Sequence, residues 1–559
     1  MIRHLITTDL RRFRWLLAAW AGLVIAYAGL LWATPGFVHD RGRYDQLTTA
    51  ILLLFFVVHV VPLVLVPVIV QADAAVGSDV FWLTHPIPPR ALLAAKAILL
   101  TAAVVVLPAT LETAAMIASR VPAAEAVRIA IDTLLAATVW LAVVMAASAI
   151  TATFPRFALL CASAVVALAA WIIVMTAITR NRMQGSVAML SVGVSPLPLA
   201  SDGTKALVLM LGLVVAGSAL LLVQYQRRQR LLSVPAGGAS AALAILLAGW
   251  WPWPLLTKAA AAPEAIARSA QLAATTASLW FPTPYAVLQP DAWRAGRLTL
   301  HAAGIAPDWV AAVAMRDARV TLSDGTVVKT RSAGFLASPP IEGTDERPER
   351  VALRHLFAVD RLVSPLPPQG ENVVGMVVTP AEYQRLTPAA YHGEFALQLS
   401  RLEIAGTQPL RPGAAYDGGV YQLALKDVAA ATSRFLRFNA IETRATSLFD
   451  PGPAESYTVY AVNRARSQAI QGTVGLLAEV NAFAGFSVHV SAGLGGGYSR
   501  HGVGVDFSVF SQSDSDIVLD EEWMKQAELV VVRTTALGSV PRTIDIPLVT
   551  ICTAKDGKC

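Results

Sequence analysis

The sequence predicts an α-helical polytopic membrane domain of six to seven transmembrane helices, followed by a mostly-β, sandwich-like soluble domain. Apolar residues make up 55% of the 559 residues and charged residues 15%, with a mean hydropathy of +0.55. This balance is more apolar than that of a soluble domain. Long apolar runs fill residues 1–256, whereas short alternating segments separated by turns fill residues 257–559. We therefore expect a membrane domain over the first range and one or two β-rich domains over the second.

The first apolar run follows a basic stretch. Arg3, Arg11 and Arg12 lie around one face of residues 1–13, and apolar side chains lie on the other face, which is typical of a helix on a membrane surface. Residues 15–33 are longer than the core of a signal peptide and are not followed by a small-residue cleavage site. We expect this run to be retained as the first span.

The remaining spans follow from the thickness of a bilayer. A hydrocarbon core of about 30 Å requires roughly 20 helical residues. The seventh run is shorter than most, contains Gly237 and Gly238, and ends in tryptophans that suit a membrane interface. The predicted spans are 15–33, 50–71, 91–113, 130–150, 157–179, 206–225 and 237–255.

Basic residues orient these spans. If the spans alternate, one side carries the densest clusters, which are Arg3, Arg11, Arg12 and Arg14; Arg90 and Lys96; Arg156; and Arg227, Arg228 and Arg230. The positive-inside rule places that side in the cytoplasm. Six arginines fall on the other side, but they are more dispersed. The sequence therefore predicts a multi-pass protein of a bacterial inner membrane, with a cytoplasmic N-terminus and an extracytoplasmic C-terminal domain.

A short aromatic segment separates the second and third spans. Ser78 is a good N-cap, and Pro86 ends the helix that it begins, so a cytoplasmic helix is predicted over about 78–86. The segment carries Phe-Trp-Leu-Thr within this helix and a Pro-Ile pair at its end, followed by Arg90 and an apolar run with an early Lys. This pattern resembles the cytoplasmic coupling segment of ABC transporter type-2 permeases, and the resemblance extends over residues 1–230.

The resemblance implies a permease subunit that works with separate ATPase subunits. It also implies a second membrane subunit, identical or paralogous, and places ATP and Mg²⁺ in the partner ATPase rather than in this chain. The residues expected to dock the ATPase are Asp79, Phe81, Trp82, Leu83 and Arg90. The seventh span and residues 257–559 depart from the six-span pattern of that family.

Motifs for chemistry within this chain are missing. The sequence contains no G-x-x-x-x-G-K-[ST] loop, no H-x-x-x-H or H-E-x-x-H pair and no C-x-x-C. We therefore predict no catalytic, cofactor-binding or metal-binding residues. The net charge of +6 arises largely from basic clusters beside apolar runs, which favours a lipid bilayer as partner and not nucleic acid.

Two ionisable residues in the predicted spans are noteworthy. His59 lies near the middle of the second span, where it either bonds a neighbouring helix or lines a substrate pathway. Lys96 lies near the start of the third span, and we expect its side chain to extend to the headgroups of the inner leaflet.

The C-terminal half contains signals for strands and turns. An Asp324-Gly325 turn lies between two predicted strands, Thr379 and Glu382 form a capping box, and a short helix is predicted over 519–526. Cys552 and Cys559 flank an Asp-Gly turn. They form either a disulfide, as an oxidising compartment would allow, or two free thiols on a terminal segment.

These observations favour a permease subunit of an ABC transporter, and specifically an exporter. The alternative is a membrane-anchored sensor or scaffold with an extracytoplasmic β domain. An enzyme has the least support, because no catalytic constellation is present.

Overall fold

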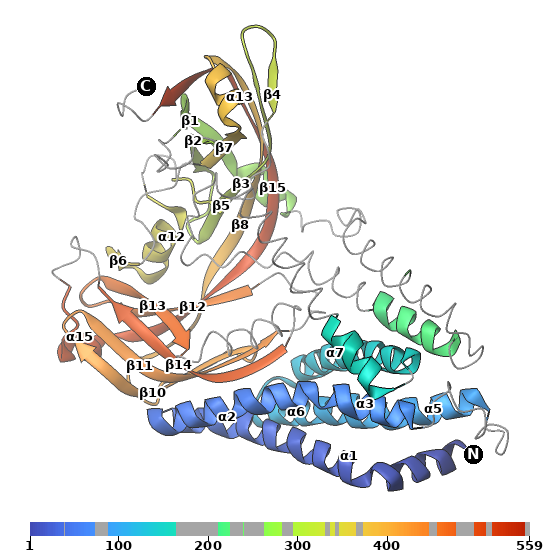
Figure 1. Ribbon diagram of the computed structural model, residues 1–559. Helices are drawn as coiled ribbons and strands as arrows, with labels where there is room; N and C mark the ends of the chain where they lie inside the picture. The colour runs from blue at the N-terminus through green and yellow to red at the C-terminus, as the bar shows by residue number, and fades with distance from the viewer. Residues whose placement is uncertain are drawn as a thin grey trace.

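A computed structural model shows an N-terminal set of helices and a C-terminal β-rich domain (Figure 1). The structure describes residues 1–38, 40–72, 88–151, 153–163, 211–223, 239, 262–281, 294–329, 336–340, 346–364, 373–446, 455–476, 497–509 and 517–553.

Four helical stretches in these described residues are long and apolar enough to cross a membrane, at Ile2–Ala33, Gln46–Gln71, Arg90–Ala118 and Ala123–Ile150. They confirm the first four predicted spans. Their elements are α1 (Ile2–Ala33), α2 (Arg41–Val60), α3 (Pro62–Gln71), α5 (Pro89–Leu100), a π-helical turn η2 (Thr101–Val106), α6 (Leu107–Ala118) and α7 (Ala123–Ile150), with a short 3-10 turn η1 (Thr34–Phe37) after α1.

The later predicted spans are described only in part. Shorter apolar helices occupy Phe154–Ser163 and Leu211–Val223, within the fifth and sixth predicted spans. The rest of these two spans, and the seventh except for Ala239, lie outside the described residues. The described part of the chain thus contains four long apolar helices, fewer than the predicted six to seven.

The basic N-terminal stretch does not form a separate surface helix. α1 is one continuous helix from Ile2 to Ala33, so this stretch extends the axis of the first span. Trp20 and Val24 of α1 pack into an apolar core with side chains of α3, α5 and α7. The helices therefore run side by side, with Met1, the end of α3 and the start of α5 at one end (Figure 1).

The described residues of the C-terminal domain form one 15-stranded, mostly antiparallel sheet. Its strands are β1 (Gln271–Phe281), β2 (Arg294–Ala303), β3 (Trp309–Thr321), β4 (Val327–Lys329), β5 (Leu336–Ala337), β6 (Arg361–Val363), β7 (Val373–Val378), β8 (Ala389–Pro409), β9 (Ala415–Asp417), β10 (Tyr421–Thr432), β11 (Phe435–Thr446), β12 (Glu455–Asn463), β13 (Gln468–Leu476), β14 (Gly497–Ser508) and β15 (Glu528–Thr553). The accompanying helices are α11 (Glu264–Ser269), α12 (Pro348–Phe357), α13 (Pro380–Arg385) and α15 (Glu521–Gln526).

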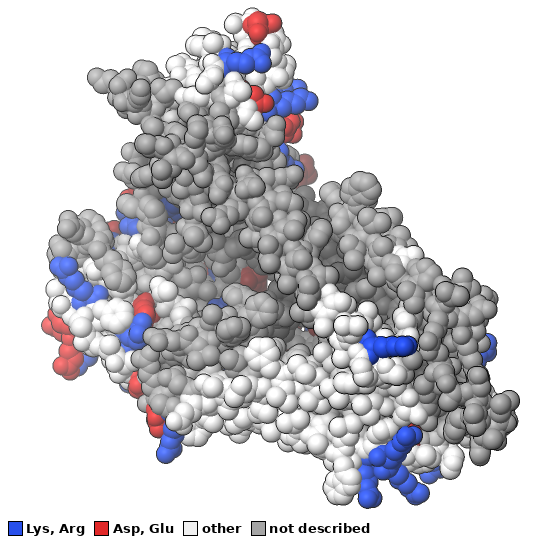
Figure 2. Space-filling model, viewed as in Figure 1, with Lys and Arg blue, Asp and Glu red and all other residues white. Residues whose placement is uncertain are grey.

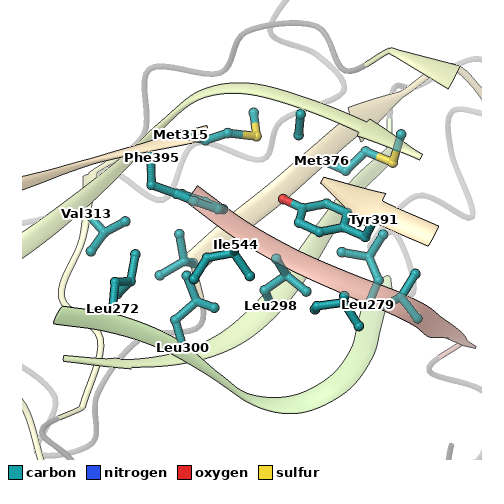
Figure 3. Packing of buried hydrophobic residues seen from close by; sticks show 14 of the residues in the cluster. Leu272, Leu279, Leu298, Leu300, Val313, Met315, Met376, Tyr391, Phe395 and Ile544 are labelled. Carbon is teal, nitrogen blue, oxygen red and sulfur yellow. The ribbon is translucent and has the colours of Figure 1, made fainter. Parts of the chain in front are cut away.

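The sheet forms two lobes with separate cores, and a third apolar cluster packs α12 against β6, β12 and β15. The first core lies among β1, β2, β3, β7 and the N-terminal half of β8, and includes Leu298, Tyr391 and Phe395 (Figure 3). The second lies among β9 to β14 and includes Phe438, Phe507 and Trp523. The long strands β8 and β15 pair with each other and pass through both lobes. Hence the predicted sandwich-like domain is one continuous sheet that packs over three apolar cores.

Local sequence signals in this domain are confirmed. Gly325 has a φ of +80° in the turn between β3 and β4, and the Asp324 carboxylate accepts from the Thr326 N–H. The Thr379–Glu382 capping box is present at the start of α13. Asp520 caps α15 through the Trp523 N–H. Each signal acts within a few residues, which is why it is readable from the sequence.

Candidate functional site at the two ends of the helices

Most predicted ATPase-docking residues lie outside the described part of the chain. Asp79, Phe81, Trp82 and Leu83 are in this group, so their role stays a prediction. Arg90 is described and exposed in the first turn of α5. α3 ends at Gln71 and α5 begins at Pro89, at the same end of the helices as the N-terminus (Figure 1). We call this end the basic end, after Arg3, Arg11, Arg12, Arg14 and Arg90.

Two polar side chains anchor the last turn of α3 at the basic end. Lys96 of α5 is fully buried, and its Nζ donates to the Ile69 and Val70 carbonyl oxygens at 2.5 and 3.3 Å. The last carbonyls of a helix lack intrahelical partners, and a cation beside them is favourable. The expectation that Lys96 extends to the headgroups is therefore wrong, because these carbonyls hold it inside the bundle.

Gln71 connects the same turn to α7. Its Nε2 lies 3.3 Å from the Ser148 carbonyl, 3.2 Å from the Thr151 carbonyl and 3.0 Å from Thr151 Oγ1. The predicted coupling segment thus leaves the membrane domain from a turn that is bonded to both α5 and α7.

His59 is exposed on α2 and bonds its own helix. Its Nδ1 lies 2.7 Å from the Phe55 carbonyl oxygen, and its ring centroid lies 4.1 Å from that of Phe55. The observed partner is thus not a neighbouring helix, and a role of His59 in a substrate pathway stays a prediction.

A π-helical turn interrupts the third span. Leu107 N–H bonds the Ala102 carbonyl five residues back. The same pattern would pair the Ala103 carbonyl with residue 108, but Pro108 has no N–H. The buried Trp20 indole of α1 donates to that carbonyl instead, at 3.0 Å. A side chain of α1 therefore compensates for the proline and ties the first span to the third.

We expect Trp20→Phe to destabilise the membrane domain by about 1–2 kcal/mol. Phenylalanine has no indole N–H, so the Ala103 carbonyl loses its hydrogen bond in a place where water does not replace it. Thermal unfolding in detergent micelles measures the effect. Trp32→Phe is the matched control, because Trp32 is in the same helix but is 52% exposed. Equal midpoints for the two variants would contradict the role of Trp20.

At the opposite end, the β domain packs against two helix connections. We call this contact the seam. It joins η1, the start of α2 and the α6–α7 connection to one face of β11 and β14. Its residues are Val38, Tyr44, Met116, Ser119, Val121, Ala126 and Ile129 on the helix side and Ile441, Ala445, Tyr498, Arg500 and Gly502 on the strand side.

The first contact of the seam is a buried tyrosine. The Tyr44 hydroxyl accepts from the Gly502 N–H at 2.8 Å and donates to the Gly502 carbonyl at 3.1 Å. Tyr44 is 4% exposed. A Cβ on residue 502 would lie 2.7 Å from the Tyr44 ring and from Val38. Glycine is therefore the residue that lets this strand approach the helices.

The second contact involves the α6–α7 connection. The Tyr498 hydroxyl is 2.6 Å from Ser119 Oγ, and Arg500 Nη1 is 3.5 Å from the same oxygen. Alternate residues of a strand point to opposite faces. Tyr498, Arg500 and Gly502 therefore share the face that meets the helices, while His501 points into the second core.

A buried ion cluster lies behind the seam. Glu442 of β11 is 3% exposed and lies 2.7 Å from Arg444 and 3.2 Å from His501 Nε2. Burial acts to raise the pKa of Glu442, but the hydrogen bond from His501 and the charge of Arg444 outweigh it. The pKa of Glu442 therefore lies below its usual 4.5.

This pKa predicts an acid-sensitive β domain. A carboxyl with a depressed folded-state pKa contributes stability that is present above its unfolded value and is lost as the pH falls through the folded value. We expect unfolding free energy to decrease below about pH 4.5. Urea unfolding of the full chain in detergent at a series of pH values measures this. Glu442→Gln should make the unfolding free energy depend less on pH in this acidic range. An unchanged pH dependence would contradict the lowered pKa of Glu442.

Cys552 is buried near the end of β15, where it pairs with Trp280 of β1. Cys559 lies outside the described residues, so its bond to Cys552 stays a prediction. The described residues contain no group of three or more His, Cys, Asp or Glu side chains that could hold a metal ion.

Comparisons with known proteins give no family for this chain, since no protein-family model, curated protein or solved structure matches it.

Proposed function

We propose that this protein is the membrane-spanning permease subunit of an ABC transporter, specifically an exporter, that couples a separate ATPase to substrate movement. The observation that supports this most is that two different parts of the chain are attached at opposite ends of the helices. The predicted coupling segment is attached at the basic end, and the β domain is attached at the other end through the seam. The spanning helices are the connection between these two attachments.

The proposed topology has six to seven spans in a bacterial inner membrane. The alternation of the predicted spans puts the connection after the first span, the connection after the third span and the β domain on the same outer side, and these three parts meet in the seam. Basic side chains gather at the opposite end, with a largely uncharged surface between (Figure 2). An arrangement of this kind suits a cytoplasmic N-terminus and an extracytoplasmic β domain.

In this proposal the chain performs no bond chemistry. ATP and Mg²⁺ bind the partner ATPase, whose closure moves the segment with Asp79, Phe81, Trp82 and Leu83. A second membrane subunit completes the pathway. Lys96 and Gln71 bind the turn from which this segment leaves, so its displacement acts on α5 and α7 together. α7 then carries the movement to the seam.

Docking of the ATPase tests this proposal. We expect Phe81→Ala with Trp82→Ala to abolish co-purification of the partner ATPase, because truncation removes the aromatic surface to which the ATPase would bind. Phe154→Ala is a useful control, since Phe154 is an exposed aromatic that is not in the segment. Unchanged co-purification of the double variant would refute the assignment.

The second candidate function is a membrane-anchored sensor or scaffold. The seam favours it, because a direct contact between an outer domain and the spans would transmit a signal without transport. A neighbouring reading frame for a P-loop ATPase supports the permease, and one for a kinase or protease supports the sensor.

A further inference from the structure

Three arginines form a stripe on the first part of α1. Arg3, Arg11 and Arg14, with Thr7 between them, follow the i, i+4, i+8, i+11 spacing of one helical face, and all are exposed. The other face of this stretch is turned toward the bundle, where Asp9 is 5% exposed and Phe13 packs against the core. In the described part of the chain no ion pair joins these three arginines to an acid. The stripe therefore faces away from the other helices and presents positive charge to the surroundings.

The position of the stripe along α1 places it against lipid. Trp15 is 76% exposed, and Arg14 lies 5.3 Å from its ring centroid. Tryptophans concentrate at membrane interfaces. From Trp15 to Ala33 the helix rises about 27 Å, which is close to the hydrocarbon core of about 30 Å.

This match sets the depth of each arginine. Arg14 and Arg11 lie about 1.5 and 6 Å beyond Trp15 along the axis, within a headgroup layer of roughly 5–8 Å. Arg3 lies about 18 Å beyond Trp15, outside that layer if the helix stands upright. Leu10, 48% exposed, is the neighbour of Arg11 and lies about 7.5 Å beyond Trp15 along the axis.

We propose that Arg11 and Arg14 bind the phosphate groups of anionic phospholipids in the leaflet at the basic end. A guanidinium donates two parallel hydrogen bonds to phosphate oxygens, and an anionic lipid adds charge attraction that a zwitterionic lipid lacks. The exposed apolar Trp15 favours lipid over an acidic protein as occupant, because acyl chains at the edge of the hydrocarbon core cover this side chain where an acidic aqueous surface would not.

The test titrates purified full-length protein in neutral detergent with phosphatidylglycerol or phosphatidylcholine, and native mass spectrometry reports the bound lipid. We expect phosphatidylglycerol to bind the wild type more tightly than phosphatidylcholine. Arg11→Gln and Arg14→Gln should each weaken phosphatidylglycerol binding roughly fivefold, and the double variant by more than tenfold. Arg3→Gln should change it less than twofold.

The matched control is Arg411→Gln with Arg434→Gln, which removes the same charge from exposed positions of the β domain. This control should keep the lipid preference, and thermal unfolding should show that all variants remain folded. Equal affinity of the wild type for both lipids would overturn the proposal. So would an unaltered preference in the Arg11→Gln and Arg14→Gln variant, which is the result expected if the stripe binds an acidic protein instead.

Discussion

Gly502→Val is expected to separate the β domain from the helices. The added Cβ would meet the Tyr44 ring and Val38 at 2.7 Å, so the strand and η1 must move apart. Overpacking and the loss of both Tyr44 hydrogen bonds together cost about 3–5 kcal/mol. Hydrogen exchange of the full chain in detergent should then show faster exchange in residues 34–44 and 498–502, with protection of the first β core unchanged.

Two further variants identify the cause. Gly475→Val adds the same side chain to β13, where a Cβ meets nothing within 4 Å, so it should leave the seam protected. Tyr44→Phe keeps the packing but removes the hydroxyl that bonds the Gly502 N–H and carbonyl. We expect this loss of two hydrogen bonds to destabilise the seam by about 2 kcal/mol. Unchanged exchange at the seam in Gly502→Val would show that this contact does not hold the two parts together.

Trp523→Ala is expected to have the largest effect on the β domain itself. Trp523 of α15 is fully buried in the second core, and its indole N–H donates to Gln468 Oε1 at 2.8 Å. Truncating a buried tryptophan leaves a cavity and costs about 3–5 kcal/mol. Thermal unfolding followed by tryptophan fluorescence and circular dichroism measures the loss.

The same variant tests whether the two lobes unfold together. β8 and β15 run through both cores, so a disrupted second core should also lower the midpoint of the first. Trp523→Phe is the comparison, because it keeps most of the packing and removes only the indole donor, at a cost of about 1–2 kcal/mol. If the first core of Trp523→Ala unfolds at the same temperature as in the wild type, the two lobes unfold independently of each other.

Periodicity and composition were sufficient for the coarse fold. The spans at 15–33, 50–71, 91–113 and 130–150 were predictable because each is a long apolar run, and length and hydropathy alone qualify a helix to cross a bilayer. The turn at Asp324-Gly325 and the cap at Thr379 were predictable because their interactions are local. The division near residue 257 is predicted from a change of pattern, and residue 257 itself lies outside the described residues.

Contacts between distant residues were not predictable in this way. Lys96 was expected at the headgroups, but the carbonyls of Ile69 and Val70 in the preceding span hold it inside. No local signal pairs Trp20 with Ala103 or Tyr44 with Gly502, which is 458 residues away. Pro108 within an apolar run was the one sequence signal that could have suggested an unusual turn in the third span.

By itself the sequence determined which segments are apolar enough for a membrane, which alternate as strands, and where short-range caps and turns lie. These depend on neighbouring residues and on the solvent around them. Only the tertiary structure decided that one sheet packs over three apolar cores, that α3 is anchored through Lys96 and Gln71, and that the β domain contacts the helix connections through Gly502. Each of these depends on groups far apart in the chain meeting at bonding distance, and that meeting is set by packing of the whole molecule.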